Sequence, residues 1–385
     1  MKIVIAPDSY KESLTALEVA TAIENGFRQV FPEAKYHKVP MADGGEGTVD
    51  AMIDATQGER IYVEVTAPLG NKVIASYGIL GNNGNNTQTA IIEMASASGL
   101  DLVPISERNP LMTSSFGTGE LIIDAMNRGV RHFILGLGGS ATNDAGSGML
   151  KALGARFYNN NGQQISEGGA ALSLLDKLDL SGINPLLKEC KIDVACDVDN
   201  PLCGIRGASH IFGPQKGASA DMVYELDKAL EHFANIVSQQ SSDSLDCRNH
   251  AGAGAAGGMG FAMMALLNAN LSPGVKLVTE TVNLNDFVKD ADLVITGEGR
   301  IDGQTVFGKT PMGVLNVAND NNVPTIAIAG SLGDGATKIM ERGMKAIFSV
   351  VPGISTLEQA LKDANNNVEL TARNVAAAIK LGKQG

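Results

Sequence analysis

Short runs of β-branched and other apolar residues, each followed by a loop and a helical stretch, recur at both ends of this chain. Residues 2–6 form the first run, and the pattern at Thr15 and Glu18 downstream is a capping box that predicts the start of a helix. The later runs are residues 292–296, 324–329 and 345–350. Alternation of strands and helices is typical of parallel βαβ units. Both ends of the chain therefore predict an α/β fold with a parallel sheet.

The middle of the chain has a different pattern. Residues 61–65 and 73–80 alternate in polarity, which indicates antiparallel strands. A chain of 385 residues also exceeds what one hydrophobic core usually serves. We therefore predict a discontinuous first domain, residues 1–60 and 285–385, with a large second α/β domain, residues 61–284, inserted into it. A cleft between two such domains is the expected place for an active site.

Composition excludes several classes of function. The formal net charge of −12 disfavours nucleic acid or an anionic membrane as a partner, because both require a basic surface. The four cysteines show no metal-ligand spacing, so we expect free thiols and a reducing compartment. The apolar run at the amino terminus is too short for a signal peptide, and no other run reaches roughly 20 apolar residues. We expect a cytoplasmic protein. The sequence does not decide between a monomer and a homodimer.

A glycine-rich segment, residues 136–144, follows a predicted strand and precedes a predicted helix. Backbone N–H groups in this position can bind a phosphate, and glycine allows the close approach. Asp144 at the end of the segment is a candidate for a magnesium ion. The alternative is a tight turn in which the glycines only supply positive φ.

Two further glycine-rich strings match known motifs in the wrong context. Residues 303–310 match the Walker A pattern, including Lys309 and Thr310, but the preceding strand ends near Thr296 instead of directly before the first glycine. Residues 252–257 match a dinucleotide fingerprint, yet polar residues precede them where a strand is required. We predict neither a P-loop nor a Rossmann site, although Lys309 can contact phosphate in another geometry. Residues 252–257 are better explained as a helix start that packs closely either against a neighbouring segment or against the adenine and ribose of a nucleotide.

Three acidic loops carry the remaining candidates for chemistry: residues 8–11, 43–46 and 297–302. In an open α/β sheet, ligands bind beyond the carboxyl ends of the strands, so these loops converge if their strands are neighbours. Carboxylates and cations together suit phosphoryl transfer, which needs an orienting base and positive charge. Asp197 and Asp199, on a turn after another predicted strand, form either a magnesium site or an Asx-turn.

Seven segments in this order resemble the glycerate kinase family. They are residues 6–14, 42–48, 136–144, 196–202, 212–218, 252–260 and 296–302. The resemblance covers nearly the whole chain. It implies ATP-dependent, magnesium-dependent phosphorylation of (R)-glycerate in glycerate breakdown, with 2-phosphoglycerate preferred over the 3-phosphate as product. It also implies a flavodoxin-like first domain and a restriction-endonuclease-like second domain.

Within that resemblance, charge type and expected placement suggest a role for each candidate residue. Lys11 and Arg300 would hold the glycerate carboxylate or the transferred phosphoryl group, because Arg offers a bidentate fork and Lys a point charge. Asp8 or Asp43 would orient or deprotonate the acceptor hydroxyl. The other substrate-binding candidates are Ser9, Glu46, Glu298 and Asp302. The candidates for binding ATP are Gly136, Gly138, Gly139, Ser140, Asn143, Lys216 and Lys309, and those for Mg²⁺ are Asp144 and Asp197.

Three other interpretations stay open at this level. Residues 136–141 are also similar to the phosphate loop of the galactokinase and homoserine kinase superfamily, although the usual preceding proline is missing. A kinase of another small hydroxy acid would fit the same residues. A nicotinamide-dependent dehydrogenase would use residues 252–257, and a non-catalytic sensor would bind ATP and glycerate without consuming them. Several acidic and basic groups converging on one site favour an enzyme.

Overall fold

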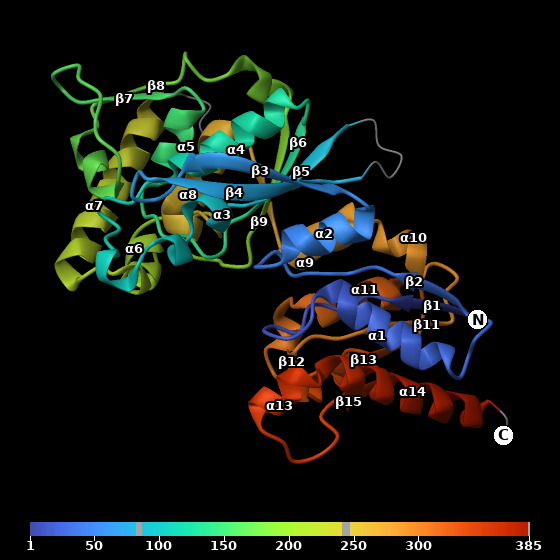
Figure 1. Cartoon of the computed structure of the whole chain (residues 1–385). Coiled ribbons are helices and arrows are strands. Elements are labelled where there is room, and N and C mark those ends of the chain that lie inside the picture. The colour runs from blue at the N-terminus through green and yellow to red at the C-terminus, as the bar shows by residue number, and fades with distance from the viewer. Residues whose placement is uncertain (82–86, 241–246, 384–385) are drawn as a thin grey trace. The chain divides into compact units, whose positions relative to one another are not determined.

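The computed structural model describes residues 1–81, 87–240 and 247–383, and these fold into two compact units. The first unit combines Met1–Gly58 with Pro273–Gly385, and the second is Glu59–Ser272 (Figure 1). Residues 273–284, which the sequence pattern assigns to the inserted domain, belong to the first unit. The cause is helix packing, since Gly313 of α11 (Thr310–Asp320) leaves room for Val275 of α9 (Gly274–Thr281).

The sheet of the first unit is parallel and has five strands, in the order β15-β13-β11-β1-β2. Their bounds are β1 (Lys2–Ile5), β2 (Lys35–Lys38), β11 (Leu293–Thr296), β13 (Thr325–Ala329) and β15 (Ala346–Ser349). This is the flavodoxin-like order, with the topological switch point between β1 and β11. The prediction of a flavodoxin-like parallel-sheet unit is confirmed.

Helices cover both faces of this sheet because strand side chains alternate between the faces. Ile326 and Ile328 of β13 pack with α1 (Ala16–Arg28) and α14 (Ala364–Gly382), while Ala327 and Ala329 pack with α11 and α12 (Lys338–Glu341) (Figure 1). The other helices of this unit are α2 (Thr48–Thr56), α10 (Leu284–Val288) and α13 (Leu357–Lys362). Two short strands, β12 (Arg300–Ile301) and β14 (Ser331–Leu332), pair beyond the sheet.

The second unit is built on a mixed sheet in the order β10-β9-β6-β5-β4-β3. Its strands are β3 (Glu59–Thr66), β4 (Lys72–Ile79), β5 (Thr89–Glu93), β6 (His132–Gly136), β9 (Lys191–Ala195) and β10 (Asn270–Ser272). β3, β4 and β5 pair antiparallel, as the alternating pattern predicts, whereas β5, β6, β9 and β10 are parallel. A small antiparallel pair is formed by β7 (Arg156–Tyr158) and β8 (Lys177–Asp179).

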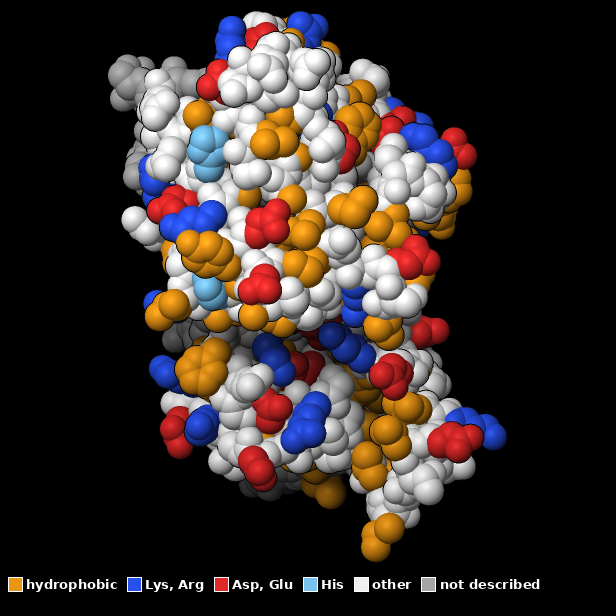
Figure 2. Space-filling view, turned by 90° about the vertical axis from the view of Figure 1, so that its left-hand side faces the viewer, with side chains coloured by type: hydrophobic (Ala, Val, Ile, Leu, Met, Phe, Trp, Pro, Cys, Tyr) orange, Lys and Arg blue, Asp and Glu red, His pale blue; other side chains and the backbone are white. Residues whose placement is uncertain are grey.

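The helices of the second unit pack around one apolar core. They are α3 (Ala95–Ser98), α4 (Phe116–Asn127), α5 (Ser147–Ala152), α6 (Ala208–Phe212), α7 (Ala220–Gln240) and α8 (Ala255–Leu267). Among the described residues, no helix combines the length and the apolar character needed to cross a membrane. On the face drawn in Figure 2, Lys and Arg side chains lie interspersed with Asp and Glu.

Candidate active site

The loops that follow β1, β2 and β11 in the first unit carry the predicted acidic residues. We call these loops the carboxyl edge. Asp8 follows β1 and Glu298 follows β11, so they stand on the two sides of the switch point, where open α/β sheets bind ligands. The Asp8 backbone N–H donates to the Gly297 carbonyl at 2.8 Å, which joins the two loops directly. Neighbouring strands thus bring together residues that lie far apart in the sequence.

Asp8 is held by hydrogen bonds to both carboxylate oxygens. Oδ1 accepts from the Ser9 backbone N–H at 2.7 Å and from the Ser9 hydroxyl at 3.3 Å, while Oδ2 accepts from the Thr310 hydroxyl at 2.5 Å. Burial, together with the nearby Asp43 carboxylate, raises the pKa of Asp8 to about 6, although hydrogen bonds from Thr310 and Ser9 oppose the rise. A carboxylate that titrates near neutral pH is suited to general base catalysis.

Glu298 lies in a second polar cluster after β11. Its Oε1 accepts from the Thr305 hydroxyl at 2.6 Å, and its Oε2 lies 3.8 Å from the ammonium of Lys309. The same ammonium is 3.9 Å from Asp302. Burial raises the pKa of Glu298 to about 7, although Thr305 and Lys309 oppose the rise. At 34% side-chain exposure and these distances, Lys309 keeps room to contact a further anion.

Arg300 and Tyr10 also belong to the carboxyl edge, one with an exposed side chain and the other with a buried one. The Arg300 side chain is 65% exposed, lies 3.6 Å from Asp302 and covers Gly333, where a Cβ would meet its guanidinium at 2.7 Å. Tyr10 is buried and donates its hydroxyl to the Ile328 carbonyl of β13 at 2.6 Å. The loop after β1 is therefore anchored to the sheet by Tyr10, and Arg300 stays accessible to a ligand.

A pocket of about 520 Å³ opens beside the same loop in the first unit. Ser9, Lys11 and Glu46, all predicted site residues, line it, and the Lys11 side chain is exposed to solvent. Asp43 lies on the loop after β2 and accepts from the Gly45 N–H at 3.1 Å. This pocket therefore contains a cation and several oxygens within reach of a small hydroxy acid.

In the second unit, the predicted glycine-rich loop follows β6 directly, as expected. Gly138 and Gly139 are its exposed residues, whereas Ser140, Asn143 and Asp144 are buried. A Cβ at Gly138 would meet no atom within 4 Å, and Gly139 has a φ of +70°. The exposed backbone at these two glycines is the part of the loop that is open to a phosphate.

Lys216 lies behind this loop, 2% exposed. Its ammonium donates to the Ser140 hydroxyl at 2.9 Å and to the Thr142 carbonyl at 2.6 Å. Burial lowers the pKa of Lys216 to about 7, while Asp144 opposes that change. In this arrangement the ammonium contacts the loop itself, whereas the sequence suggested a contact with ATP. Asn143 is buried too, and its side-chain amide donates to the Ser209 hydroxyl.

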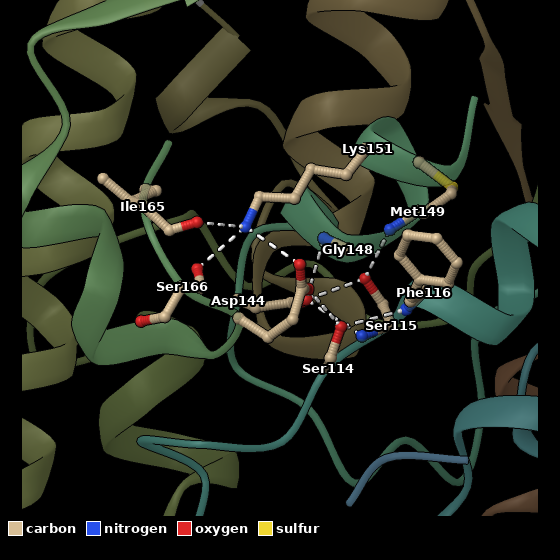
Figure 3. Close-up of polar contacts among 10 residues, drawn as sticks. Ser114, Ser115, Phe116, Asp144, Gly148, Met149, Lys151, Ile165 and Ser166 are labelled. Atoms are coloured by element: carbon tan, nitrogen blue, oxygen red, sulfur yellow. Dashed lines mark hydrogen bonds and ion pairs between the residues drawn. The ribbon is translucent and has the colours of Figure 1, made fainter. Parts of the chain in front are cut away.

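Asp144 does not fit the role of a magnesium ligand (Figure 3). It is fully buried, and it accepts from the Ser115 N–H, the Ser115 hydroxyl, the Gly146 N–H and the Gly148 N–H at 2.8–3.2 Å. The Ser115 hydroxyl accepts from the Met149 N–H, so its proton points to Asp144. A carboxylate with this many donors has little capacity left for a cation. Burial raises the pKa of Asp144.

Asp197 is exposed and stays a candidate ligand for Mg²⁺. Within the described part of the chain, no group of three or more His, Cys, Asp or Glu side chains could hold a metal ion. Mg²⁺ commonly binds through one or two carboxylates together with substrate phosphates, so one exposed protein carboxylate is compatible with a metal that arrives with a nucleotide.

The two rejected motifs have structures that explain their patterns. β12 and the short 3-10 helix η7 (Thr305–Phe307) separate β11 from Lys309, which is not the strand-to-loop connection of a P-loop. Gly257 has a φ of +65° and lies against the Thr142 carbonyl, where a Cβ would be at 2.1 Å. Residues 252–257 therefore pack against the glycine-rich loop, as the packing interpretation predicts.

Sequence reasoning missed the threonines. Thr310 is the last residue of the Walker A match, and Thr305 occupies one of its unspecified positions. Both are fully buried; Thr310 donates to Asp8, a catalytic candidate, and Thr305 donates to Glu298, a substrate-binding candidate. The available signal was two hydroxyl residues flanking Lys309 in a loop that follows a parallel strand.

A flavodoxin-like sheet with carboxylates and cations at its switch point, together with a separate glycine-rich loop, defines a phosphotransferase of the kinase class. The profile of the glycerate kinase family matches residues 3–380. A glycerate 2-kinase of Escherichia coli K12 is 54% identical, with 99% of each chain covered. A glycerate kinase of Bacillus subtilis 168 is 52% identical, covering 100% of this chain and 99% of the relative. A crystal structure assigned as glycerate kinase 2 from Salmonella typhimurium LT2 covers 100% of both chains, with a TM-score of 0.92 and 54% identity. The chain belongs to the glycerate kinase family, and it is a kinase.

Proposed function

We propose that this kinase transfers a phosphoryl group from ATP to the 2-hydroxyl of (R)-glycerate, giving 2-phosphoglycerate and ADP. Family membership and the names of the relatives, a glycerate 2-kinase and a glycerate kinase, support the choice of substrate. The observation that carries the chemistry is the position of Asp8, a partly buried carboxylate at the switch point, beside a pocket that contains Lys11. A kinase of another small hydroxy acid, or a 3-phosphate product, is the alternative.

The acceptor would be bound by charge. The glycerate carboxylate is an anion, and Lys11 and Arg300 are exposed cations at the carboxyl edge that can bind it. Asp8 would then take the proton of the acceptor hydroxyl as that oxygen attacks phosphorus. Asp43 lies close enough to raise the pKa of Asp8, so its charge supports the basicity of Asp8. Ser9, Glu46, Glu298 and Asp302 stay predicted substrate contacts.

Phosphate groups would be bound by backbone N–H groups and by Lys309. In the second unit the exposed backbone of Gly138 and Gly139 suits a phosphate, and Ser140 and Gly136 border it. In the first unit the ammonium of Lys309 would stabilise negative charge on the transferred phosphoryl group. Mg²⁺ supplies charge neutralisation for phosphates when it is bound, and Asp197 is the residue we propose for it. A cytoplasmic location stays a prediction, and the choice between a monomer and a homodimer stays open.

The test is ADP release by the purified chain with ATP and Mg²⁺, comparing D-glycerate, L-glycerate and tartrate. We expect release that depends on D-glycerate, and a loss of at least about a hundredfold in Asp8→Asn. The matched control is Glu33→Gln, an exposed carboxylate on another loop of the same unit, which should keep wild-type turnover. Turnover of Asp8→Asn at the wild-type rate would remove Asp8 from the mechanism. ATP binding without acid-dependent release would contradict the proposed reaction.

A further inference from the structure

Two buried threonines bracket the short segment 305–310 in the first unit. Thr305 begins the 3-10 helix η7 and Thr310 begins α11, and each hydroxyl donates to a carboxylate of the carboxyl edge. Between them, Phe307 is 82% exposed and Gly308 has a φ of +106°. The segment is thus fixed at both ends by hydroxyl–carboxylate hydrogen bonds, although its middle is open to solvent.

The other hydrogen bonds made by these groups show that the threonine hydroxyls are the donors and the carboxylates the acceptors. The Thr305 hydroxyl accepts from the Asp302 N–H at 3.1 Å, so its own proton is directed to Glu298. At Asp8, Ser9 donates to Oδ1, and Thr310 donates to Oδ2. A donor on each oxygen fixes the plane of the carboxylate and favours its ionised form.

The charged groups around Asp8 act in the opposite direction. Asp43 from the loop after β2 and Glu298 from the loop after β11 are both carboxyl groups, so they disfavour a negative charge on Asp8. The ammonium of Lys309 lies 3.8 Å from Glu298 and 3.9 Å from Asp302, so its positive charge is shared with those two carboxylates. The hydroxyl of Thr310 is therefore a principal group holding Asp8 as a carboxylate.

We propose that Thr310 is a positioning residue of the phosphoryl transfer, which keeps the Asp8 carboxylate oriented and ionised through its hydroxyl. The inference rests on the proposed function, in which Asp8 acts on the acceptor hydroxyl. It assigns Thr310 a role different from the magnesium ligand that a Walker A match would suggest. Thr310 touches Asp8, and its effect on the reaction passes through that contact.

The test is the pH dependence of kcat/KM for D-glycerate between pH 5 and pH 9, with thermal unfolding measured in parallel. Thr310→Val keeps the shape of the side chain and removes the donor, so the pKa of Asp8 rises. We expect the acid limb to move to higher pH by about one unit, since a hydrogen bond to a charged group has that effect. Activity relative to wild type should fall about fivefold more at pH 6 than at pH 8. Thr310→Ser restores the donor and should keep the wild-type midpoint.

Thr296→Val is the matched control, because Thr296 is equally buried but donates to the Ala6 carbonyl at 2.8 Å, not to a carboxylate. It should lose stability without moving the acid limb. If Thr310→Val cannot be purified, Thr310→Ala removes the same donor. An acid limb at the wild-type midpoint in these Thr310 variants would overturn the inference, even if the rate falls at every pH. If the acid limb is unchanged in the Thr310 variants but Asp8→Asn is inactive, only the role of Thr310 is overturned. If Asp8→Asn is active, the role of Asp8 as the base is overturned.

Discussion

The ammonium of Lys216 donates to the hydroxyl of Ser140 at 2.9 Å from a fully buried position behind the glycine-rich loop. A cation that holds the loop from behind affects phosphate binding through the conformation of the loop. Its removal would leave the Ser140 hydroxyl and the Thr142 carbonyl buried without this donor.

Lys216→Met should raise the KM for ATP by about tenfold or more, with a smaller effect on the KM for glycerate, because the loop that we propose for phosphate loses its support. Steady-state kinetics with ATP and glycerate varied separately would measure this. Lys228→Met, on the exposed face of α7, is the control and should be neutral. A wild-type KM for ATP in Lys216→Met would contradict this role.

We expect Asp144 to have a structural role and Asp197 to bind the metal, so their Asn variants should differ in stability and in Mg²⁺ requirement. Asp144→Asn removes one acceptor oxygen from a buried carboxylate with four donors, so the free energy of unfolding should fall by about 2–4 kcal/mol in denaturant titrations. Asp197→Asn should leave stability within about 0.5 kcal/mol, because the side chain is exposed. If Asp197 binds the metal, the Mg²⁺ concentration for half-maximal activity rises in that variant. An unchanged Mg²⁺ requirement in Asp197→Asn would contradict the proposal that Asp197 binds the metal.

Arg300→Ala should lower turnover by at least about a hundredfold with the fold intact, since this exposed guanidinium contributes little to stability. Gly333→Ala offers an independent test, because the new Cβ would stand at 2.7 Å from the guanidinium and displace it. Both variants should share a raised KM for glycerate and a wild-type melting temperature. Normal turnover in Arg300→Ala would exclude Arg300 from the site.

The difference in the free energy of unfolding between Glu298→Gln and wild type should depend on pH. The folded-state pKa of about 7 lies above the ordinary value of 4.5, so the folded chain binds this proton more tightly than the unfolded chain. The contribution of Glu298 to stability is therefore full below pH 4.5 and is lost as pH rises towards 7. Glutamine does not ionise, so Glu298→Gln should gain on the order of 1–3 kcal/mol relative to wild type between pH 4.5 and pH 8. Equal stability differences at both pH values, measured by denaturant unfolding, would contradict the raised pKa.

The fold was predictable to the extent that it is local. The apolar runs around β1, β11 and β13, and the capping box at Thr15, are short-range patterns, and each produces the expected element. The flavodoxin-like order of the strands came only from the resemblance, because pairing between β1 and β11 joins segments at opposite ends of the chain.

The sequence predicted which residues lie at the candidate site better than it predicted the role of each. Asp8, Glu298 and Lys309 lie where loops after neighbouring strands converge. The roles of Asp144 and Lys216 could not be inferred, because their burial depends on distant loops that meet residues 136–146. Ser115, which donates twice to Asp144, lies far upstream in the sequence and gave no local signal.

Phosphorus NMR of the product formed from ATP and D-glycerate tests the central claim most directly. Transfer to the 2-hydroxyl links phosphorus through the ester oxygen to a carbon that bears one hydrogen, so we predict a doublet that disappears in Asp8→Asn reactions. A triplet would indicate transfer to the 3-hydroxyl, where the carbon bears two hydrogens, and would contradict the proposed 2-phosphate product. Formation of no glycerate-dependent phosphate ester at all would contradict the assignment of the carboxyl edge as the site of phosphoryl transfer to glycerate.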